Sequence, residues 1–129
     1  MRVLAGRVLP VAAWAVPLLV VVQAVLIGQA QFGGSPGLVT THGIVGNVTF
    51  LAAAVALGAA VVSGRPGRVL LPLFAGALLL FAQTGLGYVG HRTGLALASS
   101  IHVGLGVALT VVTTLGAVRA GRTEAQPVR

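Results

Sequence analysis

The chain alternates between four long apolar segments and short polar connections. The apolar segments cover about residues 8–30, 39–62, 69–89 and 95–118. Each has about 20 residues or more, the length of helix that crosses a hydrocarbon core about 30 Å thick. None shows the strict alternation of a half-buried strand, and an unbroken apolar run within a bilayer satisfies its backbone groups as a helix. The pattern therefore predicts four membrane-spanning helices.

The connections are short and rich in turn-forming residues: QFGGSPG at 31–37, SGRPGR at 63–68 and GHRTG at 90–94. Short connections place consecutive helices side by side and antiparallel. The expected fold class is all-α, a four-helix transmembrane up-down bundle. It forms a single membrane domain over residues 1–119, and residues 120–129 are expected to be a disordered cytoplasmic tail.

Composition excludes several classes of protein. The chain is 57% hydrophobic and 7% charged, whereas a soluble domain carries about 25% charged residues. The net charge of +7 does not indicate nucleic-acid binding, because the arginines are dispersed to the ends of the apolar segments. The absence of cysteine excludes disulfides, thiolate zinc sites, iron–sulfur clusters and covalent CxxCH haem attachment.

The arginines predict the orientation. Arg92 stands alone on one side of the membrane, and the other seven share the opposite side: Arg2, Arg7, Arg65, Arg68, Arg119, Arg122 and Arg129. The positive-inside rule then places both termini of this multi-pass protein on the cytoplasmic side of the cell membrane. The first apolar segment is longer than the apolar region of a signal peptide, so we expect it to be retained as a helix.

The second half of the chain repeats the first without a gap. The hairpins at about 8–62 and 68–119 both contain Gln, then His, then Gly at the same spacing. The matched pairs are Gln23 and Gln83, His42 and His102, and Gly46 and Gly106. Gln and His are scarce in membrane helices, so these matches indicate an internal duplication. We call the superposition that pairs Gln23 with Gln83 the repeat alignment.

The duplication predicts a haem site. Parallel repeats place equivalent residues at similar depths, and the second and fourth helices can face each other across the bundle. We therefore predict His42 and His102 as the ligands that hold one haem iron from both sides, an iron site that imidazole suits. Gly46 and Gly106, one turn further along the same helix faces, would let the macrocycle approach the backbone.

Other polar residues have assigned or alternative roles. Arg92 would bind the haem propionates, since a guanidinium binds carboxylate well. Gln23 and Gln83 are expected chiefly to form hydrogen bonds between helices, and the alternative is that they donate to the ligating histidines. His91 is expected to be an interfacial residue. A single histidine near a helix end would favour such an ordinary structural role, and only the repeat favours haem ligation by His42 and His102.

Two segments carry a family resemblance. Residues 99–109 (SSIHVGLGVAL) resemble the haem-ligating helix of haem A synthases, and residues 83–87 (QTGLG) are similar to the glutamine segment of their preceding helix. Residues 41–46 (THGIVG) are a weaker match. Haem A synthases have eight spans in two four-helix halves, each a potential bis-histidine site, and the chain resembles one half over residues 8–118. The resemblance implies that His42 and His102 ligate a b-type haem near the extracytoplasmic surface.

The chain departs from that family in ways that bear on function. Haem A synthases have an acidic residue in an outer loop and often a cysteine pair. Here the only acid is Glu124, in the predicted tail. We therefore expect an electron-carrying cytochrome b with a redox partner protein, and no enzyme activity of the haem A synthase type. The alternatives are a cofactor-free membrane subunit or assembly factor packing through glycine-rich faces, and a small transporter that would have to rely on the histidines.

Overall fold

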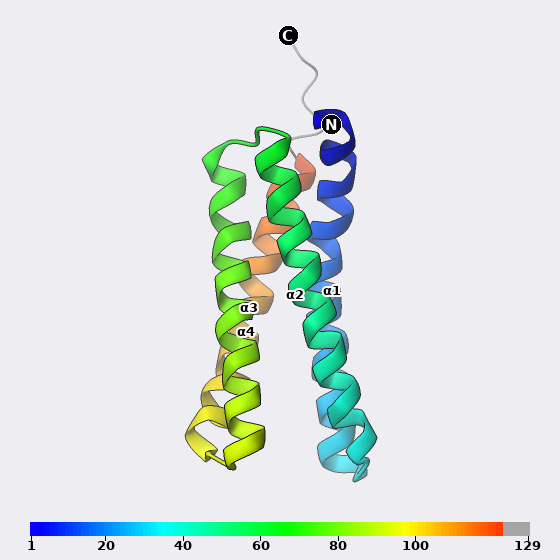
Figure 1. Cartoon of the computed structure of the whole chain (residues 1–129), viewed down its shortest axis with the longest axis vertical. Helices are drawn as coiled ribbons and strands as arrows, with labels where there is room; N and C mark the ends of the chain where they lie inside the picture. The colour runs from blue at the N-terminus through cyan, green and yellow to red at the C-terminus, as the bar shows by residue number, and fades with distance from the viewer. Residues whose placement is uncertain (123–129) are drawn as a thin grey trace.

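The computed structural model describes residues 1–122, which form four helices and no strand. The helices are α1 (Arg2–Gly33), α2 (Pro36–Val62), α3 (Gly67–Thr93) and α4 (Ala96–Arg122). They lie side by side in an up-down bundle (Figure 1), and all four are long and apolar enough to cross a membrane. The predicted fold class is confirmed.

The helices extend beyond the predicted apolar segments. Residues 120–122, predicted to belong to the tail, are instead the last residues of α4. A helix can continue past the apolar core because its backbone hydrogen bonds are internal, and arginine is a good helix former. The rest of the predicted tail, 123–129, lies outside the described residues.

The helix ends follow the repeat alignment seen in the sequence. Both α1 and α3 are followed by a glycine with φ of 67°, Gly34 and Gly94, in the left-handed conformation that glycine adopts without strain. The next helices begin at Pro36 and Ala96. Burial repeats as well, since the pattern over residues 41–49 is the same as that over 101–109. The fold is therefore built from two tandem helical hairpins.

Each helix packs against two others. The adjacent pairs are α1 with α2, α3 with α4, α1 with α4 and α2 with α3, so that α2 and α4 are diagonal partners. We call the end that carries Arg2, the 63–66 connection and Arg122 the terminus end. The opposite end, with the connections at 34–35 and 94–95, is the loop end (Figure 1).

Small side chains dominate the core of the terminus half. All four helices contribute, and the cluster consists of Leu9, Ala12, Ala13, Ala56, Ala59, Ala60, Val69, Leu73, Ala117 and Ala120. Within the second hairpin, a Cβ built on Gly76 would lie 3.1 Å from the Thr113 methyl group. Helices in a bilayer gain packing energy when small residues let their backbones approach closely.

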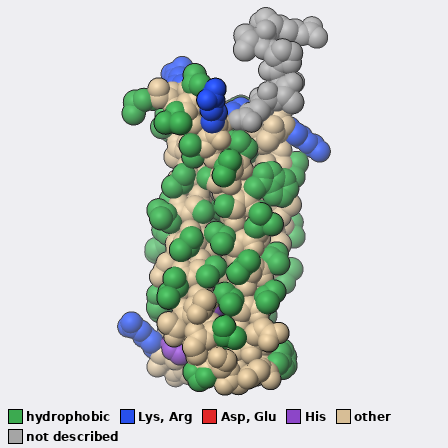
Figure 2. Space-filling model, turned by 90° about the vertical axis from the view of Figure 1, so that its right-hand side faces the viewer, with side chains coloured by type: hydrophobic (Ala, Val, Ile, Leu, Met, Phe, Trp, Pro, Cys, Tyr) green, Lys and Arg blue, Asp and Glu red, His purple; other side chains and the backbone are tan. Residues whose placement is uncertain are grey.

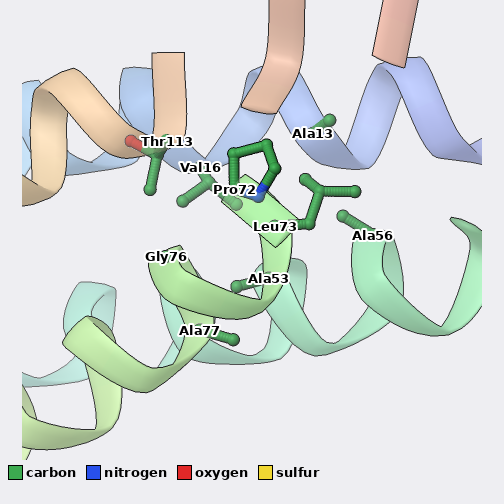
Figure 3. A pocket seen from close by; sticks show the side chains of 9 residues that line it. All are labelled: Ala13, Val16, Ala53, Ala56, Pro72, Leu73, Gly76, Ala77 and Thr113. Atoms are coloured by element: carbon green, nitrogen blue, oxygen red, sulfur yellow. The ribbon is translucent and has the colours of Figure 1, made fainter. Parts of the chain in front are cut away.

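One small cavity lies in this core. It has a volume of about 10 Å³, which is room for about one water molecule. Figure 3 shows its lining, which comes from all four helices: Ala13, Val16, Ala53, Ala56, Pro72, Leu73, Gly76, Ala77 and Thr113. The Thr113 hydroxyl donates to the carbonyl of Leu109 at 2.8 Å. The cavity is therefore apolar and too small for a cofactor.

The outer surface suits a lipid environment. Figure 2 shows hydrophobic side chains over the body of the bundle and arginine side chains at its two ends. Large apolar side chains stay exposed along every helix, among them Val11, Leu51, Leu71 and Val107 at 73%, 63%, 68% and 69% of their accessible surface. Such a surface is covered by lipid rather than by water, and the chain is a multi-pass membrane protein.

Candidate functional site

The two repeated histidines meet inside the loop half of the bundle. His42 and His102 occupy equivalent positions near the start of α2 and α4, which begin at Pro36 and Ala96. Their ring centroids are 6.1 Å apart, and the ring planes cross at 71°. Both rings are partly buried. The diagonal placement of α2 and α4 thus brings the two imidazoles together.

A backbone carbonyl orients each imidazole. His42 Nδ1 lies 3.0 Å from the carbonyl oxygen of Gln23, and His102 Nδ1 lies 2.9 Å from that of Gln83. A carbonyl oxygen only accepts hydrogen bonds, so Nδ1 carries a proton in each ring, and in the neutral form of such a ring Nε2 keeps its lone pair. Histidines that bind metals commonly donate their other ring N–H in this way.

The glutamine side chains link helices within each hairpin. Gln23 Nε2 donates to the hydroxyl of the fully buried Thr49 at 3.0 Å. Gln83 Nε2 donates to the backbone carbonyl of His102 at 2.8 Å. The predicted hydrogen bonds between helices are confirmed. The contact that each glutamine makes with an imidazole, however, comes from its backbone and not from its amide.

The predicted glycines face these amides. A Cβ built on Gly46 would lie 3.1 Å from Gln23 Oε1, and one built on Gly106 would lie 3.5 Å from Gln83 Nε2. The two glycines therefore make room for glutamine side chains of their own hairpins. Their role against a cofactor stays a prediction.

The two halves of the site differ in their surrounding side chains. Thr49, which bonds Gln23, corresponds in the repeat alignment to Leu109, which has no hydroxyl. The buried Oε1 atom of Gln83 has no hydrogen-bond partner among the described residues. The two hairpins therefore match closely in backbone geometry but differ in the side chains that surround their glutamines.

The core shared by the two hairpins stops at the level of this site. Its last buried members toward the loop end are Val20, Thr49, Leu80 and Leu109. Beyond them, the buried residues in the described chain are Gly90 and Ala98. A Cβ on Gly90 would meet Ser99 of the same hairpin, so this burial lies within α3 and α4. The loop half is thus not closed by a core common to both hairpins.

Arg92 lies outside the histidine cluster. It is exposed in the last turn of α3, next to the exposed His91, and its guanidinium carbon is 5.8 Å from the centre of the Tyr88 ring. This distance is that of a cation–π contact. Across residues 1–122, no hydrogen bond joins Arg92 to the histidines or glutamines. Its predicted contact with propionates stays a prediction.

The donor set tests what the site can hold. Within residues 1–122 there is no group of three or more His, Cys, Asp or Glu side chains that could hold a metal ion, whereas ions such as zinc take three or four protein ligands. Two imidazoles alone suit a metal whose remaining ligands come from a macrocycle. The residues present therefore fit haem iron better than a bare ion.

No protein-family model, curated protein or solved structure matches the chain. The resemblance to haem A synthases thus depends only on the short segments quoted above. Its functional implication has to be argued from the geometry around His42 and His102.

Proposed function

We propose that the protein is a small membrane cytochrome that binds one b-type haem between His42 and His102 and transfers electrons. The observation that carries the proposal is the distance of 6.1 Å between the ring centroids. Metal–imidazole nitrogen bonds are about 2.0–2.1 Å long, and the ring centre lies roughly 1 Å behind the nitrogen. Two imidazoles on opposite sides of one ion therefore have centres about 6 Å apart.

The protonation pattern supports the same proposal. With Nδ1 of each ring donating to Gln23 or Gln83, the nitrogen left for iron is Nε2 in its deprotonated, ligating form. The two carbonyls also hold the rings in place before any ligand arrives. The donor set needs no change of tautomer to bind a metal.

Ligation on both sides bears on the type of chemistry. Haem held by two histidines has no open axial position for oxygen or substrate, so it supplies one-electron transfer. The chain's own residues would ligate, orient and shield it from water, using the loop half that the shared core leaves open. Arg92, at that end of α3, would offer its guanidinium to the propionates.

We also propose an orientation. Within residues 1–122, six arginines lie at the terminus end and Arg92 alone lies at the loop end. The positive-inside rule then assigns the terminus end to the cytoplasm, which would put the haem nearer the outer surface. A redox partner would therefore approach from that surface.

The test is spectroscopic. The full chain is produced in cells supplied with ample haem, purified in detergent, and examined by reduced-minus-oxidised absorption and by haem stoichiometry. We expect one haem per chain. His42→Ala and His102→Ala are each expected to lose haem or hold it weakly, because one axial ligand is gone.

His91→Ala is the matched control, since His91 is exposed and lies outside the pair. It should keep the wild-type spectrum. Wild-type protein that stays free of haem would overturn the proposal in favour of a cofactor-free subunit. Full haem retention in both single variants would overturn the ligand assignment.

A further inference from the structure

We propose that a groove between α2 and α3 at the terminus end binds one molecule of an anionic glycerophospholipid. The groove has a volume of about 460 Å³ and is open to the outside of the bundle. Its lining residues are Leu57, Val61, Gly67, Leu70, Leu71 and Phe74. The inference does not depend on the haem proposal, because none of these residues belongs to the histidine site.

The walls of the groove are suited to an acyl chain. Val61, Leu71 and Phe74 are exposed at 61%, 68% and 56%, so they form part of the surface that lipid covers. Gly67 lines the groove where α3 begins, and a Cβ built there would meet nothing within 4 Å. The groove therefore has free space at the level of the membrane interface, and its wall carries no polar side chain.

An exposed arginine adjoins the interfacial end of the groove. Arg68 directly follows Gly67 and is exposed, whereas the guanidinium of Arg65, in the connection just before α3, lies near Gly6 of α1. Arg119 Nη1 donates to the carbonyl oxygen of Arg68 at 3.2 Å, which brings a second guanidinium to the start of α3. Residues 1–122 contain no Asp or Glu, so the charged side chains of this part of the chain are all cationic.

This combination specifies the class of ligand. Guanidinium groups bind phosphate through paired hydrogen bonds, and an apolar groove binds hydrocarbon. A phospholipid carries both groups in one molecule, and a net negative charge adds to its attraction toward Arg68 and the cationic terminus end. A zwitterionic lipid offers the same phosphate, but its ammonium group is repelled by the same side chains.

The duplication does not provide a second copy of the groove. In the repeat alignment, Leu57 and Val61 correspond to Ala117 and Gly121, and Gly67 corresponds to Arg7. The equivalent face between α4 and α1 thus loses the two apolar walls that α2 provides and places an arginine where the groove has open space. We therefore expect one such lipid for each chain.

The experiment counts bound lipid on the full chain. Detergent-solubilised protein is titrated with phosphatidylglycerol or with phosphatidylcholine of the same acyl chains, and retained lipid is read by native mass spectrometry. We expect one tightly held phosphatidylglycerol and weaker binding of phosphatidylcholine. Arg68→Gln should lower the affinity for phosphatidylglycerol about fivefold, the effect of one interfacial charge. Gly67→Leu should lower the affinity for both lipids, because its side chain fills the groove.

Two controls match these variants. Arg2→Gln removes an exposed arginine at the same end of the bundle but on α1, and Gly104→Leu adds a side chain at an open, exposed glycine in α4. Both should bind phosphatidylglycerol like the wild type. Equal binding of the two lipids, or wild-type binding by Arg68→Gln, would overturn the proposal. Competition by soluble glycerophosphoglycerol would also overturn it, since that result would indicate a simple phosphate site. If Gly67→Leu fails to fold, the binding of phosphatidylglycerol by Arg68→Gln tests the proposal by itself.

Discussion

Gly87 of α3 lies directly against the imidazole of His102 in α4. A Cβ built on Gly87 would stand 3.0 Å from Cε1 and 3.3 Å from Nδ1 of that ring. Distances below about 3.4 Å are tighter than ordinary van der Waals contact, so His102 occupies space that only glycine leaves free. The equivalent position in the first hairpin is Ile27, and the two histidines therefore have different neighbours.

We predict that Gly87→Ala weakens the proposed binding of haem by His102. The added methyl group would push the ring of His102 away from the carbonyl of Gln83, the acceptor that orients it. Loss of such an orienting contact typically costs about tenfold or more in metal affinity. The measurement is haem retained per chain after dilution in detergent. Gly85→Ala is the control, because a Cβ there meets nothing within 4 Å; equal retention in the two variants would contradict the prediction.

The crossing of the ring planes predicts a spectroscopic signature. The planes of His42 and His102 cross at 71°, closer to perpendicular than to parallel. Perpendicular axial imidazoles leave two d orbitals of low-spin ferric iron nearly equal in energy, whereas parallel ones split them. If the protein binds haem as proposed and the rings keep this crossing, electron paramagnetic resonance of the oxidised form would show the strongly anisotropic signal of near-perpendicular ligands. The resolved rhombic signal of parallel imidazoles would show that the rings bind in another orientation.

We predict that Thr49→Val weakens the first hairpin. The change removes the hydroxyl that accepts from Gln23 Nε2 at 3.0 Å and preserves the side-chain shape. Hydrogen bonds between membrane helices contribute about 0.6 kcal/mol on average and up to about 1.7 kcal/mol. The free energy of unfolding in mixed micelles should therefore fall by about 1 kcal/mol.

Thr113→Val is the matched control for that variant. Thr113 is also buried, but its hydroxyl donates only to carbonyls of its own helix, those of Leu109 and Thr110. Removing it leaves no partner on another helix unsatisfied. A loss of stability as large as that of Thr49→Val would mean that the bond to Gln23 adds nothing specific.

We predict that Gly90→Ala destabilises the second hairpin. A Cβ at this buried position would lie 2.7 Å from Ser99 Oγ and 3.3 Å from the backbone nitrogen of Ser99. Overpacking of this kind costs typically about 1–3 kcal/mol. Adding Ser99→Ala should restore part of the free energy of unfolding, because it removes the nearer atom. Wild-type stability of Gly90→Ala would show that α3 and α4 separate without cost at this level.

The number and order of the helices could be predicted because the bilayer is the solvent of this chain. A bilayer allows an apolar run only one common form, the helix, so the number and order of α1 to α4 could be derived from hydropathy alone. The repeat alignment could also be derived, because Gln and His are rare enough in such segments for their matches to carry information. The helix ends were less predictable, since α4 continues through Arg122 on backbone hydrogen bonds that hydropathy does not report.

The candidate site was predictable in its members and not in its contacts. His42 and His102 stood out through the repeat, but the contact of Gly87 with His102 could not be derived from it, because the counterpart of Gly87 is Ile27. The glutamines were expected to act through their amides. Their amides do join the helices, but their backbone carbonyls hold the imidazoles, since a helical carbonyl has a second lone pair that a neighbouring helix can use.

By itself, the sequence determined that four apolar helices form two copied hairpins and that each copy places one histidine at the same depth. Only the tertiary structure decided that the imidazoles lie 6.1 Å apart, each with Nδ1 held by a carbonyl of its own hairpin. The physical reason is that these helices are apolar on nearly every side. Their periodicity therefore does not mark an inner face, and the rotation of each helix depends on how its small residues pack against its neighbours.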